Sequence, residues 1–162
     1  MREHYKNSPQ VSFDYKLTGT GWARADLRIG TTRVSLRVSY LTDGLGDIVR
    51  AAIAIGEGAS DQTVIWVEEP GYNELAFSQR AGTVTIQIWH YPNLSPSHSG
   101  EMGELRMHQR FSPDEFFAAI SSGTRDVLSL HGVEGYKEEW HAHEYPTGDA
   151  GHLAELIGAT DE

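Results

Sequence analysis

A chain of 162 residues is long enough for one domain with a packed core and too short for two domains of ordinary size. Because it contains no cysteine, disulfide bonds, thiolate metal sites and cysteine nucleophiles are excluded. The formal net charge of −10 argues against general nucleic-acid binding, which requires clustered lysine and arginine side chains.

No stretch of the sequence approaches the ~20 apolar residues that span a bilayer, and the first ten residues are mostly polar. We therefore expect no membrane association and place the protein in the cytoplasm. We expect a single domain over residues 1–162, with a flexible N-terminus at residues 1–10.

Residues 21–41 predict a β-hairpin. Apolar and polar side chains alternate with period two on both sides of Gly30 and Thr31, which is typical of strands with one buried face. The expected apolar face consists of Ala23, Ala25, Leu27, Ile29, Val34, Leu36, Val38 and Tyr40. We expect residues 13–17 to extend the first strand, ahead of a kink at residues 18–21.

After the hairpin the period changes to that of a helix, which we expect at residues 43–55. Four more strands are expected at residues 62–69, 73–80, 83–91 and 103–110, with a long loop at residues 92–102. Ser112 as N-cap and Gly132 as terminator then define a helix, followed by a short helical segment at 133–139 and a closing helix at 149–157.

The order ββαββββαα predicts an α+β fold. We expect a single two-layer domain with a mostly antiparallel sheet of about six strands and two to three helices on one of its faces.

The open face of this sheet is a candidate partner-binding surface. Two interpretations remain open: a solvated face whose arginine stems cover aromatic rings, or a patch that binds an acidic macromolecule, because Arg, Trp and Tyr are enriched at interface anchors. The residues expected to share the face are Trp22, Arg24, Arg28, Arg33, Arg37, Trp89, Tyr91, Arg106, His108 and Arg110.

The acidic end of the chain is a second candidate surface. Residues 132–162 contain eight acidic residues against Lys137 as the one basic residue. The acids proposed to bind a partner are Glu134, Glu138, Glu139 and Glu144. Because opposed potentials accelerate association and fix orientation, this surface is expected to bind a basic protein such as a toxin nuclease.

The segment EEWHAHEYPTGD at residues 138–149 is the candidate for chemistry. His141 and His143 would point the same way on an extended chain, and Glu144 or His152 could complete a metal or acid/base site. Zinc motifs with predictive value pair two ligand clusters or place HExxH on a helix, and neither occurs here. We therefore expect no metal and no cofactor, and we expect Trp140 to be buried between the sheet end and the last helix.

The segments FDYKLTGTGWARADLRIG, SYLTDGLGDIVRA and WVEEPGY, with the closing GYKEEW and YPT, resemble those of a family of small cytosolic actinobacterial proteins of unknown function. That family has an FDY–GTGWA hairpin, an SYLxDxLGD helix entry and an EEPGE turn, where Tyr72 replaces the final acid in this chain. The resemblance implies no catalytic residue. The family's small acidic α+β form is similar to that of immunity proteins linked to polymorphic toxins.

We expect a non-enzymatic protein-binding domain, with an immunity-type inhibitor of a toxin as its specific form. The first alternative is a small enzyme or metalloprotein that uses His141, His143 and Glu144. The second is a structural subunit of a larger assembly. The sequence leaves the oligomeric state open.

Overall fold

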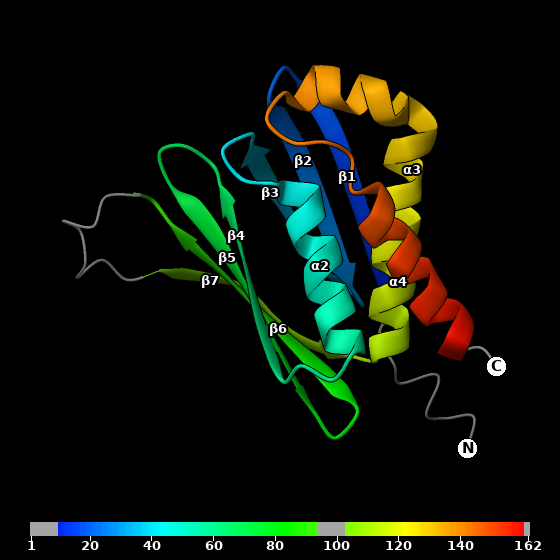
Figure 1. The fold of residues 1–162 in the computed structure, drawn as a ribbon. Helices are drawn as coiled ribbons and strands as arrows, with labels where there is room; N and C mark the ends of the chain where they lie inside the picture. Colours follow the sequence, from blue (N-terminus) through cyan, green and yellow to red (C-terminus); the bar gives the residue numbers. More distant parts are fainter. Residues whose placement is uncertain (1–9, 94–102, 161–162) are drawn as a thin grey trace.

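The computed structural model describes residues 10–93 and 103–160 (Figure 1). The flexible N-terminus expected at residues 1–10 lies outside the described residues except for Gln10. Most of the loop expected at residues 92–102 lies outside them as well.

Three strands form the first sheet: β1 (Val11–Gly19), β2 (Trp22–Ile29) and β3 (Thr32–Ser39). They pair antiparallel in the order β1–β2–β3. The predicted hairpin is therefore confirmed, except that Tyr40, expected on its apolar face, lies beyond the end of β3 and is 44% exposed. Residues 11–19 do not extend it but form a strand of their own, because the chain reverses direction between Gly19 and Trp22.

Four further strands form a second antiparallel sheet: β4 (Asp61–Val67), β5 (Tyr72–Arg80), β6 (Thr83–Tyr91) and β7 (Glu104–Phe111). The α+β class is confirmed, but the single sheet of about six strands is wrong, because the seven strands of the described residues divide between two sheets. A hydrogen bond from Gln109 Nε2 to Thr32 Oγ1, 3.0 Å long, joins β7 to the start of β3.

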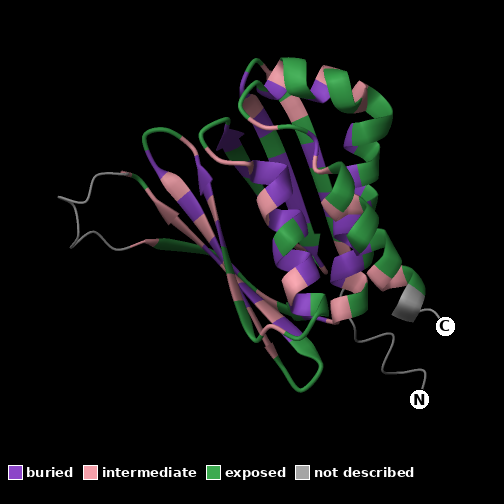
Figure 2. Cartoon of the chain, in the orientation of Figure 1, coloured by how far each residue is buried: buried purple, intermediate pink, exposed green. Residues whose placement is uncertain are grey.

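Helix α2 (Gly44–Gly56) lies against the first sheet, with the second sheet on its other side (Figure 1). Nine of its 13 residues are buried, so most of its surface is covered (Figure 2). A helix that is apolar nearly all round is expected only inside a core. The helix predicted at residues 43–55 is confirmed, and α2 is the centre of the packed interior.

Helix α3 (Pro113–Trp140) packs on β1 of the first sheet, and α4 (Thr147–Thr160) packs against α2 and α3 (Figure 1). The backbone N–H of Glu115 donates to the Ser112 side chain, as the predicted N-cap requires. Gly132 has φ 69° and ψ 172°, so α3 bends where the sequence predicts one helix to end and another to begin. None of the helices in the described residues is long and apolar enough to cross a membrane.

Trp140 packs the end of α3 against the first sheet. Its side chain is fully buried, and its ring centroid lies 6.3 Å from that of Tyr15 and 6.4 Å from that of Tyr136. The backbone N–H of Gly21 donates to the carbonyl oxygen of Glu139 over 2.7 Å. The predicted burial of Trp140 is confirmed.

We expect Trp140→Ala to lower the free energy of unfolding by about 3–5 kcal/mol, because it removes a large aromatic side chain from the core. The measurement is urea unfolding followed by circular dichroism. Leu130→Ala is the matched control, since Leu130 is 75% exposed and its truncation should change stability by no more than ~0.5 kcal/mol. A loss below about 1 kcal/mol for Trp140→Ala would contradict the packing described here.

The first turn of α2 approaches the first sheet so closely that it has no room for a side chain. A Cβ at Gly44 would lie 2.5 Å from the Tyr15 hydroxyl oxygen and 2.7 Å from Val38 Cγ1. A Cβ at Gly46 would lie 2.2 Å from a carboxylate oxygen of Asp43. These contacts give a physical reason for the two glycines in the segment TDGLGD.

Gly44→Ala should therefore destabilise the fold by about 1–3 kcal/mol through overpacking. Gly151→Ala is the control, because Gly151 lies in α4 with nothing within 4 Å of the added Cβ. Because alanine has a higher helix propensity than glycine, Gly151→Ala should be neutral or slightly stabilising. Equal effects of the two substitutions in urea unfolding would show that α2 is not packed this tightly.

Candidate functional site

The outer face of the first sheet carries five basic side chains arranged by the strand register. Lys16, Arg24 and Arg37 lie opposite one another across β1, β2 and β3 and form one row. Arg28 and Arg33 lie opposite one another in a second row on the same face. All five residues are exposed. We call these five residues the basic face.

A row of acidic and neutral side chains separates the two basic rows. Asp14, Asp26 and Ser35 are aligned across the three strands. Asp26 is only 8% exposed, and it accepts hydrogen bonds from Ser35 Oγ and from Arg24. Arg24 Nη2 lies 3.1 Å and Arg33 Nη2 lies 3.6 Å from its carboxylate oxygens. The face therefore presents charge in the order positive, negative, positive.

Burial alone would raise the pKa of Asp26. The hydrogen bonds from Ser35 and Arg24, together with the charges of Arg24 and Arg33, outweigh the burial and hold the pKa of Asp26 below its ordinary value. Asp26 therefore stays ionised and fixes the positions of two arginines.

Trp22 lies at the end of the basic face. The guanidinium carbon of Arg37 is 4.5 Å from the centroid of the Trp22 ring, a cation–π contact. Trp22 is half-buried and Arg37 is exposed. The stacking holds Arg37 in a defined position while its N–H groups remain open to solvent.

The remaining residues predicted for this face lie elsewhere. Trp89 and Tyr91 belong to β6, and Arg106, His108 and Arg110 belong to β7, all in the second sheet. The prediction of one shared open face is therefore wrong, because it assumed a single sheet. Trp89 and Tyr91 face outward on a different surface from the basic face.

The acidic residues of the last third are distributed around the end of α3. Glu134 and Glu138 are exposed, whereas Glu139 is half-buried. Glu144 is 3.1 Å from Lys137 Nζ. Because Gly21 N–H donates to the Glu139 carbonyl, this acidic segment lies next to the turn that precedes Trp22. The structure thus places an acidic surface beside one end of the basic face.

The predicted histidine cluster does not assemble. His141 is exposed at the C-cap of α3, His143 is half-buried, and His152 in α4 has its Nε2 3.1 Å from a Glu57 carboxylate oxygen. Glu144 pairs with Lys137 instead. Within residues 10–93 and 103–160, no group of three or more His, Asp or Glu side chains could hold a metal ion. The absence of a bound metal stays a prediction.

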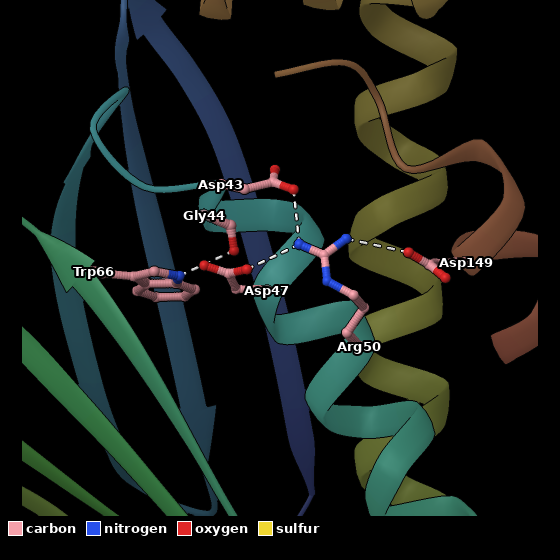
Figure 3. Close-up of polar contacts among 6 residues, drawn as sticks. All are labelled: Asp43, Gly44, Asp47, Arg50, Trp66 and Asp149. Carbon is pink, nitrogen blue, oxygen red and sulfur yellow. Dashed lines mark hydrogen bonds and ion pairs between the residues drawn. The ribbon is translucent and has the colours of Figure 1, made fainter. Parts of the chain in front are cut away.

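Arg50, which no sequence motif had indicated as a functional residue, joins α2 to α4 (Figure 3). Its Nη2 donates to Asp43 over 2.7 Å and to Asp47 over 2.8 Å, and its Nη1 donates to Asp149 over 3.1 Å. Burial would lower the pKa of Arg50, but the bonds to these three carboxylates raise it above its ordinary value. The i,i+3 spacing of Asp47 and Arg50 was a signal in the sequence for part of this network.

Several polar atoms are buried near the same helix entry. The hydroxyl groups of Tyr15 and Tyr136, the indole N–H of Trp140 and one carboxylate oxygen of Asp43 have no hydrogen-bond partner within the described residues. Burial raises the pKa of both tyrosines, and the charge of Asp43 raises it further. Both phenols therefore remain neutral.

The chain matches no protein-family model, no curated protein and no solved structure. The resemblance to the actinobacterial family stays a prediction. The basic face and the acidic segment at the end of α3 are therefore the features from which a function can be proposed.

The depressed pKa of Asp26 predicts how stability changes with pH. The charged form of Asp26 stabilises the fold above the unfolded-state pKa of about 3.9, and this contribution is lost as the pH falls through the lower folded-state pKa. The difference in free energy of unfolding between the wild type and Asp26→Asn should be constant above about pH 5 and shrink at lower pH. Asp14→Asn is the control for loss of one charge from the same face. A difference that is unchanged down to about pH 2 would contradict this account.

Proposed function

We propose that the protein is a non-catalytic protein-binding domain and that the basic face is its main contact surface. The observation that carries this proposal is the alignment of three cations, Lys16, Arg24 and Arg37, directly across three strands. The adjacent Trp22 supplies a residue type that is enriched at the energetic centres of interfaces.

The basic rows are unfavourable for the isolated sheet. Like charges directly opposite one another on a sheet face destabilise it, and the cost recurs for Arg28 opposite Arg33. Asp26 offsets part of the repulsion through Arg24 and Arg33. In the described part of the chain, Lys16 has no ion pair. Carboxylates of a bound partner would remove the remaining repulsion.

The pattern of charge favours a protein over a nucleic acid. A phosphate backbone presents negative charge without interruption, whereas the basic face is divided by Asp14 and Asp26. The formal net charge of −10 also opposes a polyanion. A protein surface with carboxylates spaced around a basic or neutral group complements the three rows, and such complementarity selects the correct partner.

The specific form that we propose is an immunity-type inhibitor that binds a toxin and covers a functional surface of it. The exposed Glu134 and Glu138 lie in the segment of α3 that contacts the turn before Trp22. One partner could therefore contact both the basic face and this acidic segment, and surfaces of both signs would fix its orientation. If the captured partner is a toxin, an equimolar amount of this protein should inhibit it.

Charge reversal tests the proposed contact. The partner is first captured from the native host with the wild-type protein, and association rates are then measured at two salt concentrations. Arg33→Glu/Arg37→Glu should slow association on the order of tenfold at the lower salt concentration while leaving thermal stability almost unchanged. Glu134→Lys/Glu138→Lys tests the acidic segment in the same way.

Arg80→Glu is the matched control, because Arg80 is an exposed residue at the β5–β6 turn of the second sheet. If a partner binds but neither double substitution changes its association rate more than Arg80→Glu does, the electrostatic proposal is wrong. Turnover of a small molecule that His141→Ala abolishes would instead establish the enzyme alternative.

A further inference from the structure

On the outer face of the second sheet, Glu74 is surrounded by aromatic and apolar side chains. Glu74 on β5 lies directly opposite Trp89 on β6 and Ile65 on β4. Tyr72 and Tyr91 occupy the next outward-facing pair of positions. Their rings stack with centroids 4.9 Å apart and an interplanar angle of 16°. All five residues are half-buried.

Within residues 10–93 and 103–160, Glu74 forms no ion pair, whereas Glu104 near the same end of the sheet pairs with Arg106 at 3.0 Å. Burial raises the pKa of Tyr91, and the nearby charge of Glu74 raises it further. The carboxylate therefore acts on the aromatic group electrostatically, and a cation placed here would interact with both the carboxylate and the ring faces.

The orientation of Trp89 is fixed by its own hydrogen bond. Its Nε1 donates to Gln87 Oε1 over 3.1 Å. The indole is thus held on the face that carries Glu74. Next to it the sheet has a shallow hollow of about 260 Å³, with Thr63, Ala76 and Gln87 among its lining residues.

The shape of this face suits a side chain of a partner protein better than a free small molecule as its ligand. Small-molecule sites usually have volumes of about 300–1,000 Å³ and enclose most of their ligand, and this hollow is smaller and open. Leu105, opposite Trp89 on β7, is 45% exposed. A partner that also covers Leu105 would bury apolar surface around the charged contact.

We propose that the face around Glu74 binds an arginine side chain of a partner protein. The guanidinium would form charge-assisted hydrogen bonds with the Glu74 carboxylate and stack on Trp89, Tyr72 or Tyr91. A guanidinium fits better than an ammonium because it is planar, is more weakly hydrated and stacks on aromatic rings. This inference does not depend on the basic face, which lies on the other sheet.

The test uses a tetra-arginine peptide as the probe and the indole N–H resonance of Trp89, assigned with Trp89→Phe, as the readout. The arginine peptide should shift this resonance in a saturable way. A tetra-citrulline peptide, which is neutral and nearly isosteric, should not shift it. Glu74→Gln should raise the dissociation constant of the peptide on the order of tenfold, because a charged hydrogen-bond acceptor is lost.

Asp126→Asn is the control, since it removes one negative charge from an exposed position on α3 that belongs to neither proposed contact surface, and it should leave the dissociation constant unchanged. Three results would overturn the proposal: equal shifts with citrulline, an equal rise of the dissociation constant in Asp126→Asn, or no shift of the Trp89 resonance. Binding of free arginine amide as tightly as the peptide would assign the site to a small cation instead of a partner protein.

Discussion

The close contact between the first turn of α2 and the first sheet is the constraint on which the rest of the structure depends. The Gly44 position touches Tyr15 and Val38, and the Gly44 carbonyl accepts a hydrogen bond from Trp66 Nε1 of the second sheet over 2.9 Å (Figure 3). A single turn of helix therefore contacts both sheets. A side chain at this position would clash with Tyr15 and Val38, so either these side chains or α2 would have to shift.

The same helix also positions the last part of the chain. Arg50 connects α2 to Asp149 in α4, and Tyr145, which lies between α3 and α4, donates its hydroxyl to the Thr124 carbonyl over 3.1 Å. The Arg50 contacts are partly exposed, so their net energy is modest. Their role is geometric, because they connect α4 to α2.

With both sheets using their inner faces for the core, their outer faces are available for binding. The first sheet places cations on its outer face, and the second places Glu74 among aromatic rings. Neither arrangement improves the core. Under both proposals, binding therefore depends on the residues that alternate with the buried ones along each strand.

The individual strands and helices could be predicted because each depends on side chains a few positions apart in the sequence. The alternation in residues 21–41 and the helical spacing of Leu45, Ile48 and Val49 follow from neighbours a few positions apart. Gly132 marked the kink in α3 for the same reason. Alternation shows which side chains point inward, but not which strands share a sheet. The break between the two sheets, which falls between β3 and β4, could therefore not be predicted. For the same reason the placement of Trp89 and Arg37 on different sheets could not be predicted.

The site residues could likewise be predicted only where their positions follow from a local pattern. The rows of the basic face depend on the register of β1, β2 and β3, and the hairpin pattern alone was enough to place Arg24, Arg33 and Arg37 on one side. By contrast, His141, His143 and His152 are close in sequence but lie in a cap, a loop and a helix with different directions. Proximity along the chain is a weak guide to a site once a left-handed residue such as His141, with φ 73°, intervenes.

If a partner binds the basic face as proposed, the net charge and the basic face act on it at different distances. At physiological ionic strength the screening length is about 8 Å, so a distant acidic partner experiences weak repulsion from a molecule of charge −10. Within that length the partner meets the local rows of Arg24, Arg33 and Arg37, and the interaction becomes attractive only in one orientation. An acidic protein that binds through a basic face therefore excludes most encounters and retains those in which the face itself is presented, so the segregation of charge contributes to specificity more than to affinity.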